Sequence, residues 1–231
     1  MKRYLIMGIM GMCLFWATAM ECVAQSVAYK PFKHYTDRVK EFDRMRAVDS
    51  TDIVMLGNSL TEFAGDWNIL LKAKHVRNRG IAGDDAEGIR HRLDQILPGR
   101  PKAVFLMVGI NDLSHDLTAE QVARLAIGVI TDIRTKAPGT RLYVQSLLPI
   151  NESYGKWKTL EGKTDVVPQI NRMIEHHCKR HGIDFVNLYP HFIRKGTNDL
   201  RDELTQDGLH LSAHGYKVWA FLLGRYFREL Q

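Results

Sequence analysis

The sequence predicts an α/β protein: a three-layer α/β/α fold in which helices cover both faces of a five-stranded parallel sheet. Short strand-like segments alternate along the chain with longer segments whose apolar residues recur at helical spacing, which is typical of β-α units. The most apolar segment, residues 103–108, suits a strand buried on both faces. The 231 residues are 45% hydrophobic and 25% charged, without a break in composition, so we expect one globular domain after an N-terminal leader.

The first expected element is an amphipathic helix within residues 31–49. Its apolar positions are Tyr35, Val39, Phe42 and Met45. The first strand is expected at residues 53–56, and Gly57 lets the chain turn sharply where this strand ends. A short apolar patch at residues 67–71 predicts a helical turn over the site region, and residues 76–80 predict a second, shorter strand.

The next unit begins at Asp84 and Asp85, which stand where helix caps stand. The apolar positions of the expected helix are Ile89, Leu93, Ile96 and Leu97. Pro98 should stop it. The strand at residues 103–108 follows, and its apolar character predicts a central place in the sheet. Thr118 is the expected N-cap of a further helix. Its apolar positions include Val122, Leu125, Val129 and Ile133.

The last third of the chain predicts two strands, at residues 142–148 and 183–188, with a helix at residues 165–180 between them. A polar loop at residues 151–163 is long enough to be functional rather than a tight connector. After an irregular stretch, Ser212 is the expected N-cap of the final helix. The apolar residues of that helix are Val218, Trp219, Leu222, Leu223, Tyr226 and Phe227.

Ser59 follows the first predicted strand, at the edge where open α/β sheets bind ligands. The stretch 59–62, SLTE, also fits a capping box with Ser59 at the N-cap, which would give this serine a structural role only. Residues 57–62, GNSLTE, resemble the first sequence block of the GDSL, or SGNH, hydrolases. Asn58 stands where that family usually has aspartate.

Three later segments resemble the remaining blocks of the same family, in the same order. They are residues 80–84 (GIAGD), 108–112 (VGIND) and 207–210 (DGLH). The four blocks span nearly the whole chain after the leader. The resemblance implies a serine esterase, similar to the acetylhydrolase and sugar acetylesterase members, with a flavodoxin-like strand order. We expect it to need no metal and no organic cofactor.

Acyl transfer needs a nucleophile, a base, a group that orients the base, and donors for the developing oxyanion. Ser59 is the predicted nucleophile and His210 the predicted base, with Asp207 holding the imidazole, as the matching residues do in the family. The predicted oxyanion donors are the backbone N–H groups of Ser59 and Gly83 and the side-chain amide of Asn111. Ser59, Gly83 and Asn111 follow the first three strands, so they can converge at one sheet edge.

Each of these residues also has a structural interpretation. Asn111-Asp112 and Asp207-Gly208 are ordinary turn pairs, Gly83 fits a loop glycine, and His210 fits a surface histidine. His210 and His214 have a spacing that suggests metal ligands, but a helix that starts between them would orient the two rings differently. The three-residue separation of Asp207 from His210, and the absence of a second glycine after Ser59, argue against an α/β-hydrolase.

The preferred substrate class is a small acyl ester, most of all an acetyl group on a carbohydrate. Trp67, Tyr154 and Trp157 are candidates for stacking on a sugar, and each also fits a packing role. A lysophospholipase or thioesterase on the same fold is the nearest alternative. A non-catalytic glycan-binding protein with a relic site and a metal-dependent hydrolase are alternatives from other classes.

The N-terminus has the pattern of a secretory signal peptide. Lys2 and Arg3 precede an apolar run at residues 4–20, and small residues follow up to Ala24. We expect cleavage near Ala24, so that residues 25–231 form a periplasmic or extracellular hydrolase domain without a stable membrane span. An uncleaved anchor is the alternative.

Cys178 is the only cysteine outside this leader, so we expect no internal disulfide. It lies near His176, His177 and His181, a combination that can bind metal, but basic residues at a helix end also suit the helix dipole. The net charge of +6 is scattered rather than interleaved with aromatic residues, so we expect no nucleic-acid partner.

Overall fold

A five-stranded sheet forms the centre of the computed structural model, which describes residues 29–230. All four strand pairs are parallel, and the order is β2-β1-β3-β4-β5. The strands are β1 (Ile53–Gly57), β2 (Val76–Gly80), β3 (Ala103–Leu106), β4 (Arg141–Gln145) and β5 (Asp184–Val186). This order confirms the predicted flavodoxin-like α/β fold, in which ligands bind where the strand order reverses, beside β1.

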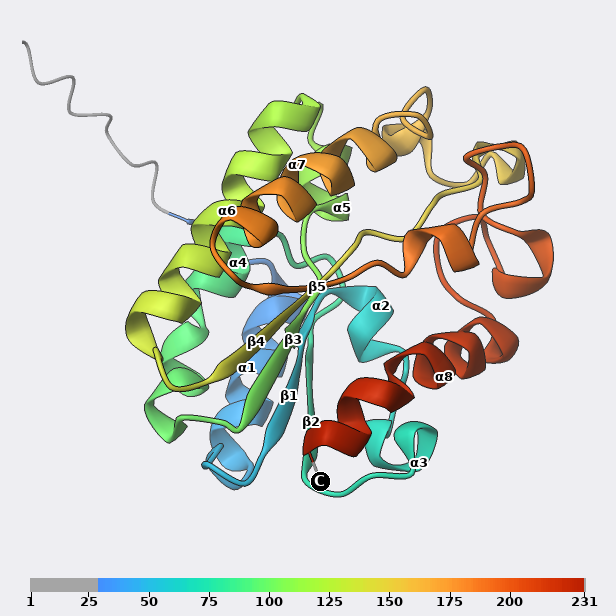
Figure 1. Cartoon of the computed structure of the whole chain (residues 1–231). Helices are drawn as coiled ribbons and strands as arrows, with labels where there is room; N and C mark the ends of the chain where they lie inside the picture. Colours follow the sequence, from blue (N-terminus) through green and yellow to red (C-terminus); the bar gives the residue numbers. More distant parts are fainter. Residues whose placement is uncertain (1–28, 231) are drawn as a thin grey trace, which may run out of the picture.

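Helices cover both faces of this sheet (Figure 1). The helices α1 (Lys33–Arg44), α4 (Ala86–His91), α6 (Ala119–Lys136) and α7 (Val167–Arg180) lie on one face. On the other face lie α3 (Trp67–Leu71) and α8 (Ala213–Leu230), while α2 (Ser59–Glu62) and α5 (Ile110–Ser114) start at the carboxyl ends of β1 and β3. Single 3₁₀ turns occupy Leu93–Gln95, Leu97–Gly99, Glu152–Tyr154, Lys158–Leu160, Tyr189–His191 and Asp202–Leu204.

Two elements differ from the sequence prediction for a visible reason. The helix that starts after Asp85 ends at His91 instead of reaching Leu97, because Arg92 leaves helical geometry (φ −116°, ψ 9°) and its side chain is only 1% exposed. The strand expected at residues 142–148 ends at Gln145. Beyond it, the Asn171 side chain pairs with both the N–H and the C=O of Leu147, at 2.7 and 3.0 Å, in place of a neighbouring strand.

The prediction that residues 67–71 cover the site is wrong. These residues do form a helix, but α3 packs against α8 and β2. The Trp67 side chain is fully buried, its ring lies edge-on to Trp219 with the centroids 5.1 Å apart, and its indole N–H donates to the Thr61 carbonyl at 3.1 Å. Trp67 is therefore a core residue and cannot stack on a sugar.

The predicted leader, residues 1–24, lies outside the described residues. In the part of the chain that the structure does describe, none of the helices has the length and apolar character needed to span a bilayer.

Candidate active site

The start of α2 orients Ser59. The N-cap of this helix is Asn58, whose side-chain oxygen accepts a hydrogen bond from the Leu60 N–H at 3.0 Å. The capping-box interpretation, with Ser59 as the cap, is therefore wrong. Because Asn58 satisfies the helix terminus, the Ser59 hydroxyl is free for other contacts. It lies 3.0 Å from Nε2 of His210, although Ser59 is only 6% exposed.

His210 is held in a short loop by Asp207. Its Nδ1 lies 2.9 Å from Oδ2 of Asp207, while Oδ1 of the same carboxylate accepts from the N–H groups of His210 and Leu209 at 2.7 and 3.0 Å. With the proton on Nδ1, the ring donates to Asp207 and its Nε2 accepts from the Ser59 hydroxyl. Ser59, His210 and Asp207 thus form one hydrogen-bonded chain.

The ionisation of Asp207 suits this arrangement. Partial burial by itself raises the pKa of Asp207, but the hydrogen bonds from the His210 ring and from the His210 and Leu209 N–H groups outweigh burial, so the pKa is lowered. A carboxylate that stays ionised stabilises a positive charge on the neighbouring imidazole.

The Asp207 loop requires glycine next to its carboxylate. Gly208 has φ +87°, and a Cβ at this position would lie 2.3 Å from the Asn151 carbonyl oxygen. This close approach of the two backbone segments allows the Asn151 N–H to donate a hydrogen bond to the Gly208 carbonyl at 2.7 Å. Thr205 Oγ1 closes the loop by donating to the His210 carbonyl at 2.7 Å and accepting from the Gly208 N–H at 2.9 Å.

The loop after β2 presents the second candidate oxyanion donor. Gly83 is exposed and has φ +84°, a conformation that L side chains rarely adopt. Among residues 29–230, the structure contains no acceptor for the N–H of Gly83 or of Ser59. Glu62 at the end of α2 accepts from the Ala82 N–H at 2.5 Å, which ties the Gly83 loop to the helix that carries Ser59.

Asn111 joins this loop from the carboxyl end of β3. Its Nδ2 donates to the Asp84 carbonyl at 2.7 Å, which fixes the orientation of the amide. An amide nitrogen carries two hydrogens, so one remains available for a ligand. The 81–84 loop thus connects the three candidate oxyanion donors. It carries Gly83, it is bonded through Ala82 to Glu62 on the helix of Ser59, and it is bonded through Asp84 to Asn111.

A buried arginine ties the same two strand ends together. Arg92 donates to Oδ2 of Asp84 at 2.7–2.8 Å, to the Arg79 carbonyl at 2.9 Å and to the Gly57 carbonyl at 3.0 Å. Arg92 therefore contacts the residue after Gly83 and the last residue of β1, two positions before Ser59. Sequence analysis missed this role, because a lone arginine in a helical segment normally indicates a solvated position.

Asp112, next to Asn111, is a second buried carboxylate in this region. It is 3% exposed, and both of its oxygens accept from the Ala86 N–H at 3.1–3.2 Å. Burial raises the pKa of Asp112 to about 6, although the Ala86 N–H acts in the opposite direction.

Aromatic side chains flank the His210 ring. Trp157 lies edge-on to it with the ring centroids 5.0 Å apart, and Phe63 lies on a tilted plane at 5.1 Å. Both are accessible, with 39% and 52% exposure. Tyr154 is half-buried beside Gly208. Phe63 was not predicted, yet its position four residues after Ser59 on a helix was a usable signal.

The predicted metal-binding alternatives concern clusters of His, Cys, Asp and Glu side chains. Between residues 29 and 230, no three His, Cys, Asp or Glu side chains gather in a geometry that could hold an ion. Cys178 is fully buried in α7, and burial raises its pKa to about 11, which keeps the thiol protonated at neutral pH.

Comparison with known proteins identifies a family and several similar proteins. The model of the GDSL-like lipase/acylhydrolase family matches residues 55–218. Over 171 residues, the chain is 29% identical to human platelet-activating factor acetylhydrolase IB subunit alpha1, covering 71% of this chain and 70% of the human protein.

Solved structures share the fold. A GDSL-like lipase from Bacteroides thetaiotaomicron superposes with a TM-score of 0.74 at 19% identity, covering 85% of this chain and 98% of that one. An acetyl xylan esterase superposes with a TM-score of 0.62 at 18% identity, covering 76% and 98% of the two chains. An acetyl-xylooligosaccharide esterase from Geobacillus gives 0.62 at 15% identity, covering 79% and 96%.

Proposed function

Since the chain belongs to the GDSL-like lipase/acylhydrolase family, and is therefore a carboxylic ester hydrolase, we propose that Ser59, His210 and Asp207 carry out its chemistry. The observation that supports this most directly is the hydrogen-bonded chain from Ser59 Oγ through both nitrogens of His210 to Asp207, at 3.0 and 2.9 Å. These three residues come from two segments about 150 positions apart, so local backbone geometry does not explain their contact.

In the first half of the reaction, Ser59 Oγ attacks the carbonyl carbon of the ester while its proton moves to Nε2 of His210. The resulting imidazolium is stabilised by the ionised Asp207. When the tetrahedral intermediate collapses, the bond to the alcohol oxygen breaks and the alcohol leaves with the proton from Nε2. The acyl group remains on Ser59.

In the second half, water attacks the acyl-enzyme and gives one proton to Nε2 of His210. Collapse of the second intermediate breaks the bond to Ser59 Oγ, releases the carboxylic acid and returns the proton to Ser59. In both halves the oxyanion receives hydrogen bonds from the N–H groups of Ser59 and Gly83 and from the Asn111 amide. Such preorganised donors provide electrostatic stabilisation without a metal.

We propose a short acyl group, acetyl in particular. Three proteins that this chain resembles are named for acetyl groups: an acetylhydrolase, an acetyl xylan esterase and an acetyl-xylooligosaccharide esterase.

The alcohol part of the substrate is proposed to be a carbohydrate. Trp157 and Phe63 present accessible aromatic surface next to His210, and sugar rings pack their apolar faces on such surfaces. Tyr154 is a further candidate from the same loop. Export to the periplasm or outside, after removal of residues 1–24, would bring the enzyme to such polymers.

A substrate series tests this function. Purified protein should hydrolyse p-nitrophenyl acetate faster than the butyrate and octanoate esters, and it should release acetate from acetylated xylooligosaccharides. Rates that stay flat or rise with chain length would favour a lysophospholipase or thioesterase. Labelling by a serine-directed fluorophosphonate, absent in Ser59→Ala, separates an enzyme from a glycan-binding relic, and loss of activity in chelator would support a metal-dependent hydrolase.

A further inference from the structure

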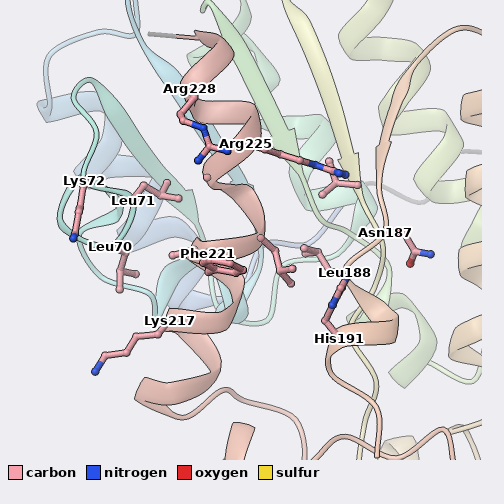
Figure 2. A pocket seen from close by; sticks show the side chains of 14 residues that line it. Leu70, Leu71, Lys72, Asn187, Leu188, His191, Lys217, Phe221, Arg225 and Arg228 are labelled. Carbon is pink, nitrogen blue, oxygen red and sulfur yellow. The ribbon is translucent and has the colours of Figure 1, made fainter. Parts of the chain in front are cut away.

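A groove on the α8 side of the molecule lies apart from the catalytic residues (Figure 2). It runs between α8, the end of α3 and the segment that follows β5, and it has a volume of about 740 Å³. Neither Ser59 nor Asp207 nor His210 lines it. The groove therefore needs an explanation that is independent of ester hydrolysis.

The lining of this groove is strongly cationic. It includes Lys72 from the end of α3 and Lys217, Arg225 and Arg228 from α8, and it contains no carboxylate. All four cations are exposed, and within residues 29–230 none of them pairs with a carboxylate. Unpaired cations that share one surface repel one another, so an anionic partner would stabilise them.

The same surface also exposes a large apolar side chain. Phe221 is 84% exposed and lines the groove between Lys217 and Arg225, and Ile69, which lies outside the groove lining on the neighbouring α3, is 76% exposed. Figure 2 shows Lys217, Phe221, Arg225 and Arg228 following one another along α8. This spacing of four, four and three residues puts them on one side of the helix. Leu70, Leu71 and Leu188 add apolar side chains to the lining of the groove.

We propose that this surface binds an anionic phospholipid membrane. Exposed apolar side chains between cations are the pattern of helices that lie in a bilayer interface, where phenylalanine enters the acyl boundary and lysine and arginine contact lipid phosphates. An acidic polysaccharide would match the cations, and one of its sugar rings could pack on Phe221, but it would leave the exposed aliphatic side chain of Ile69 on the neighbouring α3 without a favourable contact. The combination of both kinds of side chain therefore favours a lipid surface.

Vesicle flotation tests the proposal. The chain from residue 25 onward keeps every contact described above and lacks the apolar run of the leader, which would itself bind lipid. This protein should float with phosphatidylcholine vesicles that contain 30% phosphatidylglycerol, but not with pure phosphatidylcholine. Binding should weaken as salt rises from 0.05 to 0.5 M, because salt screens exposed charges.

Two sets of variants test the cations and the apolar side chains separately. Lys217→Gln/Arg225→Gln/Arg228→Gln should weaken binding about 100-fold, since each cation near an anionic surface contributes about fivefold. Phe221→Ser/Ile69→Ser should abolish the binding that persists at high salt. The control Lys33→Gln/Lys136→Gln/Lys179→Gln removes the same charge from α1, α6 and α7 and should bind like the wild type. Hydrolysis of p-nitrophenyl acetate, unchanged in all three, verifies the fold.

Several outcomes would overturn the proposal. The first is that no binding occurs to vesicles with phosphatidylglycerol, and the second is that the control triple variant loses binding as much as the α8 variant does. The third is that polygalacturonate binds through the same three cations while the vesicles do not, which would identify a polysaccharide site instead.

Discussion

The two sides of the proposed catalytic site are built in different ways. The side of the proposed nucleophile, with Ser59, Gly83 and Asn111, is held together by buried polar groups from separate elements, above all Arg92. The base side, with Asp207 and His210, is held mainly by hydrogen bonds among residues 205–210. One hydrogen bond, between Ser59 Oγ and His210 Nε2, joins the two sides.

This difference indicates how each side should respond to mutation. Groups that connect distant strands contribute to the folding of the core as well as to the geometry of the site, so losing them should cost stability. Groups within one short loop orient a side chain, and their loss should affect activity with a smaller effect on folding. The predictions below test this division.

The largest effect should follow from removing either end of the bond that joins the two sides. Ser59→Ala and His210→Ala should each lower kcat roughly 10⁶-fold, and the double variant should lose no more than either single one, because the residues act as a unit. Steady-state kinetics on p-nitrophenyl acetate, corrected for traces of wild type, measures this. Additive losses in the double variant would show that the two residues act separately.

Arg92→Leu should destabilise the fold by about 3–5 kcal/mol, because it leaves Asp84 buried without its partner. The matched change on the base side is Thr205→Val, which removes three hydrogen bonds of the 205–210 loop but leaves no buried charge. It should cost only about 1–2 kcal/mol. Urea unfolding measures both changes in stability. Equal losses of stability would contradict the view that buried groups from separate elements hold one side of the site and bonds within one loop hold the other.

Asn111→Ala should lower kcat roughly 10²–10³-fold, which is the usual cost of losing one oxyanion donor. KM should change little, since the donor acts mainly on the charge that develops in the transition state. Asn111→Asp is the sharper variant, because a carboxylate at this position would repel the oxyanion and should be worse than alanine. A large rise in KM with unchanged kcat would instead make Asn111 a ground-state binding residue.

The last prediction concerns the pH dependence of stability. The folded-state pKa of Asp112 is raised to about 6, above its unfolded value, so the folded state binds the proton more tightly. The contribution of Asp112 to stability is therefore present below about pH 4 and is lost as the pH rises to about 6. Relative to the wild type, Asp112→Asn should gain up to about 3 kcal/mol of stability across this window. Urea unfolding at pH 4, 5, 6 and 7 measures the difference, which should be constant if Asp112 is not perturbed.

Local patterns predicted much of the fold. Thr118 caps α6 as expected, and the structure adds a capping box in which Thr118 accepts from the Gln121 N–H and Gln121 accepts from the Thr118 N–H. Gly57 and Gly80 end β1 and β2 as the sequence indicated. Both features depend on residues within one turn or one strand, so a short window of sequence contains the information.

The positions of candidate site residues could be predicted from the sequence where they depend on strand ends, and not where they depend on packing. Ser59, Asn111 and the 207–210 loop follow strands or precede a helix, so the direction of a parallel sheet constrains where they lie. Trp67 and Phe63 are both aromatic residues shortly after Ser59, yet one is fully buried against Trp219 and the other is 52% exposed beside His210.

The sequence by itself thus determined the α/β class, the strand ends at which polar residues gather, and the candidate residues for ester hydrolysis. Only the tertiary structure decided that Asn58 caps α2, that Arg92 is buried between β1 and β2, and that cations and apolar residues share one face of α8. The physical reason is range: capping and periodicity act within a few residues, whereas the burial of a side chain depends on neighbours that the chain brings together from far along its length.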